Sequence, residues 1–419
     1  MGGKLNFLDL FAGAGGLSEG FIRAGFSPVS HVEMDRSACL TIKTRMAYHW
    51  LKAHDRLDCY VDYLNRKISR TEFYNLIPPR LMESVINIEI RDNSMDEIFN
   101  IIDALLEGKP LNLIIGGPPC QAYSIVGRSR DSNRMMGDKR NYLYTYYAEF
   151  LKRYVPEYFV FENVTGLLSA KGQDGVRYID KMLSLFRETG YETEFRVLSS
   201  EKYGVPQNRQ RIILVGKKGR ETAFYPEPDR WHPGIDVIEV LQDLPAIRSG
   251  EGSVAPCYLE KYSGHYLYDA GIRNDGIPVT WHQARQHTEQ DLEIYRITVE
   301  RWNNHGELLN YNDLPERLKT HKNRSSFVNR FRVVCGNKPF SHTIVAHIAK
   351  DGHYYIHPDI GQNRSLTPRE AARLQTFPDD YFFENVSEVA GYSSPFRQIG
   401  NAVPVLLAHK IAKKLMEKW

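Results

Sequence analysis

The stretch LNLIIGGPPC, residues 111–120, decides how this chain folds. Leu111–Ile115 is almost wholly apolar and is bounded by glycines, which is typical of a strand buried on both faces of a parallel sheet. Pro118 and Pro119 stiffen the exit because proline fixes φ. Cys120 follows at the carboxyl end of the strand, where α/β sheets place their ligands. A lone cysteine is usually a small buried hydrophobe, but glycine and proline would interrupt such packing, so we predict that Cys120 is a nucleophile.

A second unit of the same kind opens the chain. Phe7–Phe11 is a short apolar strand, Ala12–Gly16 is a glycine-rich turn, and Leu17–Ile22 has helical spacing. The turn is GxGG rather than GxGxxG, so a dinucleotide phosphate is not indicated, although glycine lets some ligand approach the backbone. The next strand ends in Glu33 and Asp35. These acids could accept hydrogen bonds from ribose hydroxyls, or they could be solvated loop acids.

A third strand over 158–161 ends in Glu162, which would therefore lie at the same sheet edge as Cys120 and could donate a proton to a substrate. Ser94 with Glu97, and Thr367 with Glu370, are predicted to form capping boxes. Other predicted elements are helices over 98–106, 143–154, 179–186 and 405–416, strands over 28–32, 195–198 and 211–215, and a hairpin over 341–356. The alternation predicts an α/β fold with a doubly wound, mostly parallel sheet.

Composition shifts after about residue 225, where proline, tryptophan, tyrosine and histidine become frequent. We therefore predict a large domain over 1–230, completed by 385–419, and a smaller domain over 231–384. Residues 317–350 contain eight Lys or Arg and no Asp or Glu, interleaved with aromatics, which favours a nucleic-acid surface over a basic face without a partner. The basic loop 125–142 is predicted to be a mobile cover rather than an ordinary solvated loop.

The overall composition excludes several classes of protein. The 419 residues are 42% hydrophobic and 25% charged, as in ordinary globular proteins, and contain no apolar run long enough to span a bilayer. The N-terminus enters a strand at once, so no signal peptide is expected. The five cysteines form no CxxC pair, so we expect no metal site, no disulfide framework and a cytoplasmic setting. A net charge of +3 is too small to indicate a partner.

Seven stretches in order resemble the motifs of the cytosine-C5 DNA methyltransferase family: Phe7–Gly16, Glu33, Gly117–Gln121, Glu162–Val164, Gln207–Arg211, Arg364–Pro378 and Gln398–Pro404. The resemblance implies an S-adenosylmethionine-dependent methyltransferase fold in which 231–384 is a target-recognition domain, with double-stranded DNA as partner. Because the chain begins at the first motif, we expect a monomeric prokaryotic or phage modification enzyme of the restriction-modification type.

The resemblance also assigns roles by position. Cys120, Glu162, Arg209 and Arg211 would be catalytic, with Arg209 bracing the site. The cofactor would be bound by Phe11, Gly13, Gly15 and Gly16 around its methionine part, Glu33 at the ribose, Met34 and Leu143 on the adenine, Pro119 beside Cys120, and Asn401. The acid that meets the adenine amino group stays open among Asn87, Glu89 and Asp92. Tyr123 stands where the family often has Phe.

The implied chemistry is coherent. The Cys120 thiolate would add to C6 of a cytosine flipped out of the duplex, which makes C5 nucleophilic, while Glu162 presents a proton to N3. Three alternatives are weaker. A transfer-RNA cytosine methyltransferase would usually have a shorter second domain. A silent binding homologue would not need Cys120, Glu162 and Arg209. A nicotinamide-dependent oxidoreductase would not have the GxGG turn or the Pro-Pro-Cys exit.

Overall fold

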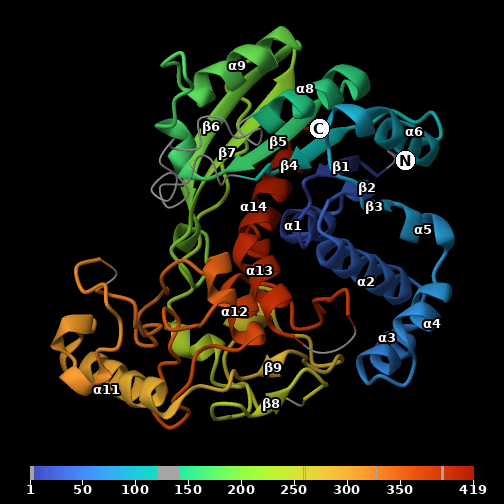
Figure 1. The fold of residues 1–419 in the computed structure, drawn as a ribbon. Coiled ribbons are helices and arrows are strands. Elements are labelled where there is room, and N and C mark those ends of the chain that lie inside the picture. The colour runs from blue at the N-terminus through green and yellow to red at the C-terminus, as the bar shows by residue number, and fades with distance from the viewer. Residues whose placement is uncertain (1–3, 120–141, 258, 260, 327, 388–390) are drawn as a thin grey trace.

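The computed structural model describes residues 4–119, 142–257, 259, 261–326, 328–387 and 391–419. A seven-stranded sheet in the upper half of Figure 1 has the order β3-β2-β1-β4-β5-β7-β6, and β7 is antiparallel to both of its neighbours while the strands from β3 to β5 are parallel. The predicted doubly wound, mostly parallel α/β sheet is confirmed. The strands are β1 Asn6–Leu10, β2 Ser27–Val32, β3 Val85–Ile86, β4 Leu113–Gly116, β5 Tyr158–Asn163, β6 Tyr191–Ser199 and β7 Gln210–Lys218.

The sheet is buried on both faces because alternate side chains of each central strand enter different core clusters. Phe7 and Ile115 belong to one cluster, Leu8 and Ile114 to the other. β4 is apolar along its whole length because both of its faces are buried. The helices are α1 Gly16–Ala24, α2 Arg36–Ala53, α3 Leu57–Leu64, α4 Arg70–Asn75, α5 Pro79–Glu83, α6 Met95–Leu106, α8 Leu143–Tyr154, α9 Tyr178–Glu188, α10 Tyr266–Asp269, α11 Glu289–His305, α12 Pro368–Leu374, α13 Ser393–Asn401 and α14 Val405–Met416.

The C-terminal helix returns to the sheet at the start of the chain. α14 packs against α1, and both run beside one another near the centre of Figure 1. A Cβ on Gly20 would lie 2.4 Å from the Ala408 side chain, so this close helix contact requires glycine. The first face's core cluster also takes in Trp281, Val334 and Ile344 from the second half of the chain. The sheet and the predicted second domain therefore share buried surface, and the domain boundary stays a prediction.

The lower half of the molecule has little regular structure. One local prediction fails there, and another fails at the start of α6. The strands described in it are β8 (Gly252–Ser253) and β9 (His282–Gln283). The hairpin predicted over 341–356 is wrong, because Ser341 exchanges backbone hydrogen bonds with Pro206 and Asn208 and residues 346–349 form a 3₁₀ turn. The capping box at Ser94 is also wrong, since its hydroxyl donates to the carbonyls of Glu89 and Arg91.

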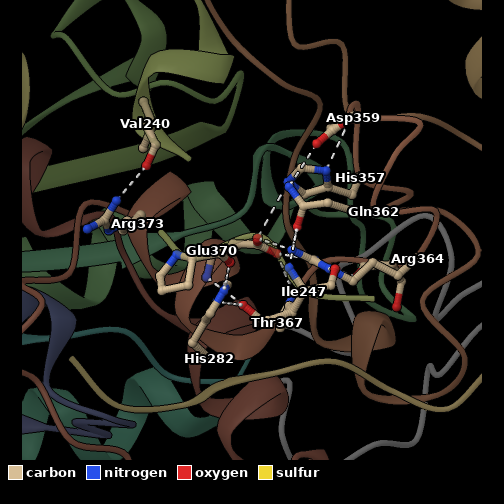
Figure 2. A network of polar contacts seen from close by, with 12 residues as sticks. Val240, Ile247, His282, His357, Asp359, Gln362, Arg364, Thr367, Glu370 and Arg373 are labelled. Atoms are coloured by element: carbon tan, nitrogen blue, oxygen red, sulfur yellow. Dashed lines mark hydrogen bonds and ion pairs between the residues drawn. The ribbon is translucent and has the colours of Figure 1, made fainter. Parts of the chain in front are cut away.

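Buried ion pairs hold the irregular half together in place of secondary structure (Figure 2). Arg364 donates from both terminal nitrogens to the Glu370 carboxylate, at 2.7 Å each, and from Nε to the carbonyl of Ile247. Burial by itself would raise the pKa of Glu370, but Arg364 together with His357 and His282 outweighs burial and holds that pKa well below its ordinary value. The predicted Thr367 capping box is confirmed, with Thr367 N–H also bound by Glu370 at 2.7 Å. The Arg364–Glu370 pair thus fastens the start of α12 to the remote segment that carries Ile247.

Candidate active site

A cleft of about 1110 Å³ opens at the carboxyl ends of β1, β2, β4 and β5. Its walls come from the turns that follow these strands and from the starts of α2, α8 and α13. The position is the one that parallel α/β sheets use for ligands, because several connections of the sheet meet there.

None of the described helices combines the length and apolar character needed to cross a membrane, and no described group of His, Cys, Asp or Glu is arranged to hold a metal ion.

The cleft brings together most of the residues that the resemblance assigned to the cofactor. Those that line it are Phe11, Gly13, Gly16, Glu33, Met34, Pro119, Leu143 and Asn401. Gly13 has a left-handed φ of 55° and faces open space, since an added Cβ would meet nothing within 4 Å. Gly15 is not among the lining residues: it precedes α1 with φ 77°, and a Cβ there would lie 3.0 Å from the Tyr381 hydroxyl. Gly15 therefore shapes the turn and does not form the wall.

Glu33 is held by main-chain donors at the end of β2. Gly13 N–H donates to its Oε2 at 2.8 Å and Asp35 N–H to its Oε1 at 2.7 Å. Burial raises the pKa of Glu33, and these two N–H groups oppose the rise. The carboxylate is thereby fixed across the mouth of the glycine turn.

Of the three candidates for the contact with the adenine amino group, two line the cleft and one does not. Asn87 donates from its amide nitrogen to the carbonyls of Glu33 and Met34, so it fixes the loop after β2 and does not line the cleft. Glu89 and Asp92 both line the cleft. Asp92 accepts a hydrogen bond from the Tyr146 hydroxyl at 2.7 Å.

Glu162 lies within β5 and forms an ion pair at the cleft wall. Arg211 Nε is 2.7 Å from Glu162 Oε1, and both side chains are mostly buried. A Cβ on Gly117 would lie 2.6 Å from Glu162 Oε2, so glycine at this position lets the carboxylate lie against the exit of β4. Asn163 donates to the Pro118 carbonyl at 3.3 Å and ties the same two strand ends together. Glu162 is therefore beside the Gly-Gly-Pro-Pro turn.

Arg209 binds two backbone carbonyls that are remote from it in sequence. The salt bridge to Glu162 comes from Arg211, whereas the Arg209 guanidinium donates to the carbonyls of Ile344 at 2.7 Å and Gly400 at 3.0 Å. Arg209 is 1% exposed and is absent from the residues that line the cleft. That Arg209 braces the catalytic site stays a prediction. Cys120 and the loop residues 120–141 lie outside the described residues.

One buried acid in the cleft was missed from the sequence. Asp9 lies on β1, is 1% exposed, lines the cleft, and has an Oδ2 without a hydrogen-bond partner among the described residues. Burial, reinforced by the Glu33 carboxylate, raises the pKa of Asp9 well above its ordinary value. A carboxyl inside the apolar strand Phe7–Phe11 was a signal that could have identified it, because a buried charge needs a partner.

The run 317–350 is free of acids in sequence but not in space. Arg317 pairs with Glu293 of α11, while Lys319 and Arg324 pair with Glu316 at 2.9 Å and 3.0 Å. Lys322 lies in the exposed stretch 320–326 and takes part in none of these pairs. The cationic surface of the run is therefore smaller than its composition indicates.

The chain matches the family model of C-5 cytosine-specific DNA methylases over residues 5–61 and 69–417. It is 40% identical to the type II methyltransferase M.Bpa9945I of Bacillus paralicheniformis, over 98% of each chain. It is 30% identical to the type II methyltransferase M.XorII of Xanthomonas oryzae, over 98% of this chain and 84% of that one.

Solved structures agree in fold. A protein described as a DNA modification methyltransferase encoded within an Escherichia coli prophage superposes with a TM-score of 0.62 at 24% identity, covering 99% of both chains. The S. pombe Dnmt2 methyltransferase superposes with a TM-score of 0.51 at 16% identity, covering 99% of both chains. The chain belongs to the C-5 cytosine-specific DNA methylase family, and the expectation of a DNA cytosine-C5 methyltransferase of the restriction-modification type is confirmed.

Proposed function

We propose that this chain transfers a methyl group from S-adenosylmethionine to C5 of a cytosine flipped out of one short duplex DNA sequence, through a covalent Cys120–C6 intermediate. The observation that carries the proposal is the Arg211–Glu162 ion pair in the wall of the cleft, against the turn Gly117–Pro119 that leads into Cys120. An oriented carboxyl group against the residues that precede Cys120 supports the assignment of Cys120 and Glu162 to one reaction.

The cleft fits S-adenosylmethionine in charge and shape. The Asp9 carboxyl, whose Oδ2 has no hydrogen-bond partner among the described residues, is suited to the cofactor's cationic part, and Glu33 is suited to its ribose hydroxyls. Met34 is 61% exposed, which leaves an apolar surface for a planar base beside Leu143. Glu89 or Asp92 would accept from the adenine amino group. When bound, the cofactor supplies an electrophilic methyl group on a sulfonium.

The residues of the chain would divide the remaining work. Cys120 Sγ forms a bond to C6, and Glu162 gives a proton to N3, so that the ring electrons become available at C5. Arg211 would hold the Glu162 carboxyl in its position between β5 and the β4 exit. After C5 takes the methyl group, a base removes the C5 proton, the C5–C6 double bond reforms, the thiolate leaves and N3 returns its proton to Glu162. Arg209 would support this region indirectly by fastening the carbonyls of Ile344 and Gly400.

The target is duplex DNA rather than RNA in this proposal, since curated relatives such as M.Bpa9945I and M.XorII are named as type II methyltransferases. Residues 231–384 would form the target-recognition domain and supply phosphate contacts from free cations such as Lys322. A base inside a duplex is out of reach, so it must be extruded at a cost of a few kcal/mol.

Bisulfite sequencing of DNA from cells that express the chain tests the proposal. We expect one short sequence motif in which cytosine is fully protected, and no protection with Cys120→Ala. Parallel bisulfite sequencing of cellular RNA covers the alternative. Protection confined to transfer RNA, or identical protection with the Cys120→Ala variant, would overturn the proposal.

A further inference from the structure

The helices α3 and α4 contact a chain segment that adjoins the cleft, although they are remote from the cleft itself. They lie beyond α2 at the lower right of Figure 1, whereas α13 and α14 run through the centre. No residue from 39 to 87, all of them described, is among the residues that line the cleft. Residues 384–386, which lie between α12 and α13, connect the two regions.

Arg70, at the start of α4, binds three consecutive residues of this segment. Its Nη1 donates to Glu384 Oε2 at 3.3 Å and to the Asn385 carbonyl at 2.7 Å, and its Nη2 donates to the Val386 carbonyl at 3.0 Å. The side chains of Arg70 and Glu384 are 14% and 4% exposed. A planar guanidinium suits several acceptors in fixed directions at once.

The Glu384 carboxylate is surrounded by the same helical region. Its Oε1 accepts from the hydroxyls of Thr44 and Tyr63, each at 2.6 Å. Burial raises the pKa of Glu384, and Arg70 is the cation that opposes the rise. Removing Arg70 would therefore leave a buried carboxylate without its counter-charge, which is costly to any structure that keeps it in place.

The backbone of Glu384 carries this constraint to the cleft. Its N–H donates to Thr41 Oγ1 at 2.8 Å and its carbonyl accepts from Gln398 Nε2 at 2.9 Å. Thr41 Oγ1 donates to Gln398 Oε1 at 2.6 Å and closes a three-residue ring. Gln398 lines the cleft on α13, one turn before Asn401, and Ala38 lines it one turn before Thr41.

We propose that Arg70 and Glu384 are positioning residues for the cofactor, which act through Gln398 and hold α13 and α2 at their separation across the cleft. The inference rests on the proposed function only in naming S-adenosylmethionine as the ligand. It predicts that loss of the pair weakens cofactor binding although neither residue reaches the cleft.

Calorimetric titration of the full chain with S-adenosylmethionine and S-adenosylhomocysteine tests this without any DNA. We expect Arg70→Ala to raise both Kd values by roughly 3- to 30-fold, the range by which residues remote from a ligand alter its affinity. Lys67→Ala is the matched control, because Lys67 is an exposed cation of the same region whose ion pair among the described residues is with Asp62. It should leave Kd unchanged.

Two further variants keep the inference falsifiable if Arg70→Ala does not fold. Arg70→Lys retains the charge but not the fork of donors, and Glu384→Gln retains hydrogen bonds but not the charge, so each should give an intermediate Kd. With DNA present, KM for the cofactor should rise while kcat changes little. Unchanged Kd in folded Arg70→Lys and Glu384→Gln, even with a lowered Tm, would overturn the positioning role. Failure of the unmodified chain to bind either ligand would instead overturn the proposed cofactor.

Discussion

Arg211 Nε lies 2.7 Å from Glu162 Oε1, while Arg209, two residues earlier, donates to backbone carbonyls of Ile344 and Gly400. Two arginines of one motif therefore do different things. Arg211 is on β7 and meets a side chain of the neighbouring β5, whereas Arg209 precedes β7 and joins two segments that follow it by more than a hundred residues. Arg211 forms part of the wall of the cleft, and Arg209 fastens two remote backbone segments.

The two arginines should separate in mutagenesis. Arg211→Ala should keep the wild-type Tm but lower single-turnover methylation by about 10- to 100-fold, the value of a hydrogen bond to a charged group. Arg209→Ala should instead lower stability by about 2–4 kcal/mol, because it strips partners from two buried carbonyls. Thermal unfolding and single-turnover rates, measured on both variants, distinguish a loss of stability from a loss of catalysis. The reverse pattern would assign the bracing of the active site to Arg209.

Glu162→Gln separates proton donation from positioning. The amide can still hydrogen-bond the flipped cytosine but cannot transfer a proton, so methylation should slow by ~10²–10⁴-fold. Base flipping, followed through 2-aminopurine at the target, should stay near the wild-type level, and Glu162→Ala should lose both. A wild-type rate with Glu162→Gln would mean that this residue only holds the base.

The nucleophile can be trapped chemically. DNA with 5-fluorocytosine at the target should form a covalent adduct with the wild-type chain, because fluorine cannot leave as the C5 proton does. Cys120→Ala should form none, and Cys120→Ser should be nearly inactive because a hydroxyl is far less acidic than a thiol. Calorimetry should show intact cofactor binding in both variants. Active wild-type enzyme without an adduct would reject the covalent scheme.

Cofactor binding should release a proton from Asp9. Burial keeps the pKa of this carboxyl well above its ordinary value, and a bound cation would favour the ionised form. Asp9 is therefore protonated in the free chain and ionised in the complex. Affinity for S-adenosylmethionine should rise with pH until Asp9 is already ionised in the free chain. Calorimetry in buffers of different ionisation enthalpy measures the release. Asp9→Asn should abolish it, and unchanged release in that variant would assign the proton to another group.

Buried neutral histidines should make the fold acid-sensitive. Burial lowers the pKa of His31 to about 3, whereas an unfolded histidine titrates near 6.5. Below pH 6.5 the unfolded state binds the proton and the native state does not, so stability falls as pH falls, and His31 alone costs about 2 kcal/mol at pH 5. Denaturant unfolding between pH 7 and 5 should show a steeper loss for the wild type than for His31→Leu. Parallel pH profiles would exclude His31 as a cause.

Free cations should dominate the salt dependence of DNA binding. Lys322→Ala should reduce the slope of log K against log salt by about 0.9, one phosphate contact. Arg317→Ala is the matched comparison, and its effect should be smaller because Arg317 is already paired with Glu293. Glu293→Gln should strengthen binding by releasing Arg317. Equal slopes for wild type and Lys322→Ala would show that this part of the run is a solvated face.

Much of the sheet could be predicted from the sequence because local pattern records local burial. The apolar run 111–115 and the predicted helices over 143–154 and 405–416 correspond to β4, α8 and α14. Since parallel strands share one functional edge, the place of the cleft followed from the strand ends that carry Glu33 and Glu162, whereas Phe11, Met34, Leu143 and Asn401 were assigned by the family resemblance. The failed hairpin over 341–356 shows the limit, because Ser341 N–H donates to the Pro206 carbonyl and the Ser341 carbonyl accepts from Asn208 N–H.

Only the tertiary structure decided which charges meet. Glu162 forms its ion pair with Arg211. Glu293 and Glu316 pair with cations of a run that contains no acid. Arg70 binds a segment more than three hundred residues away. Periodicity determines which face of an element is buried, since that depends on neighbours three or four residues apart. An ion pair depends on distances of a few ångströms between remote segments, and no local pattern in the chain carries that information.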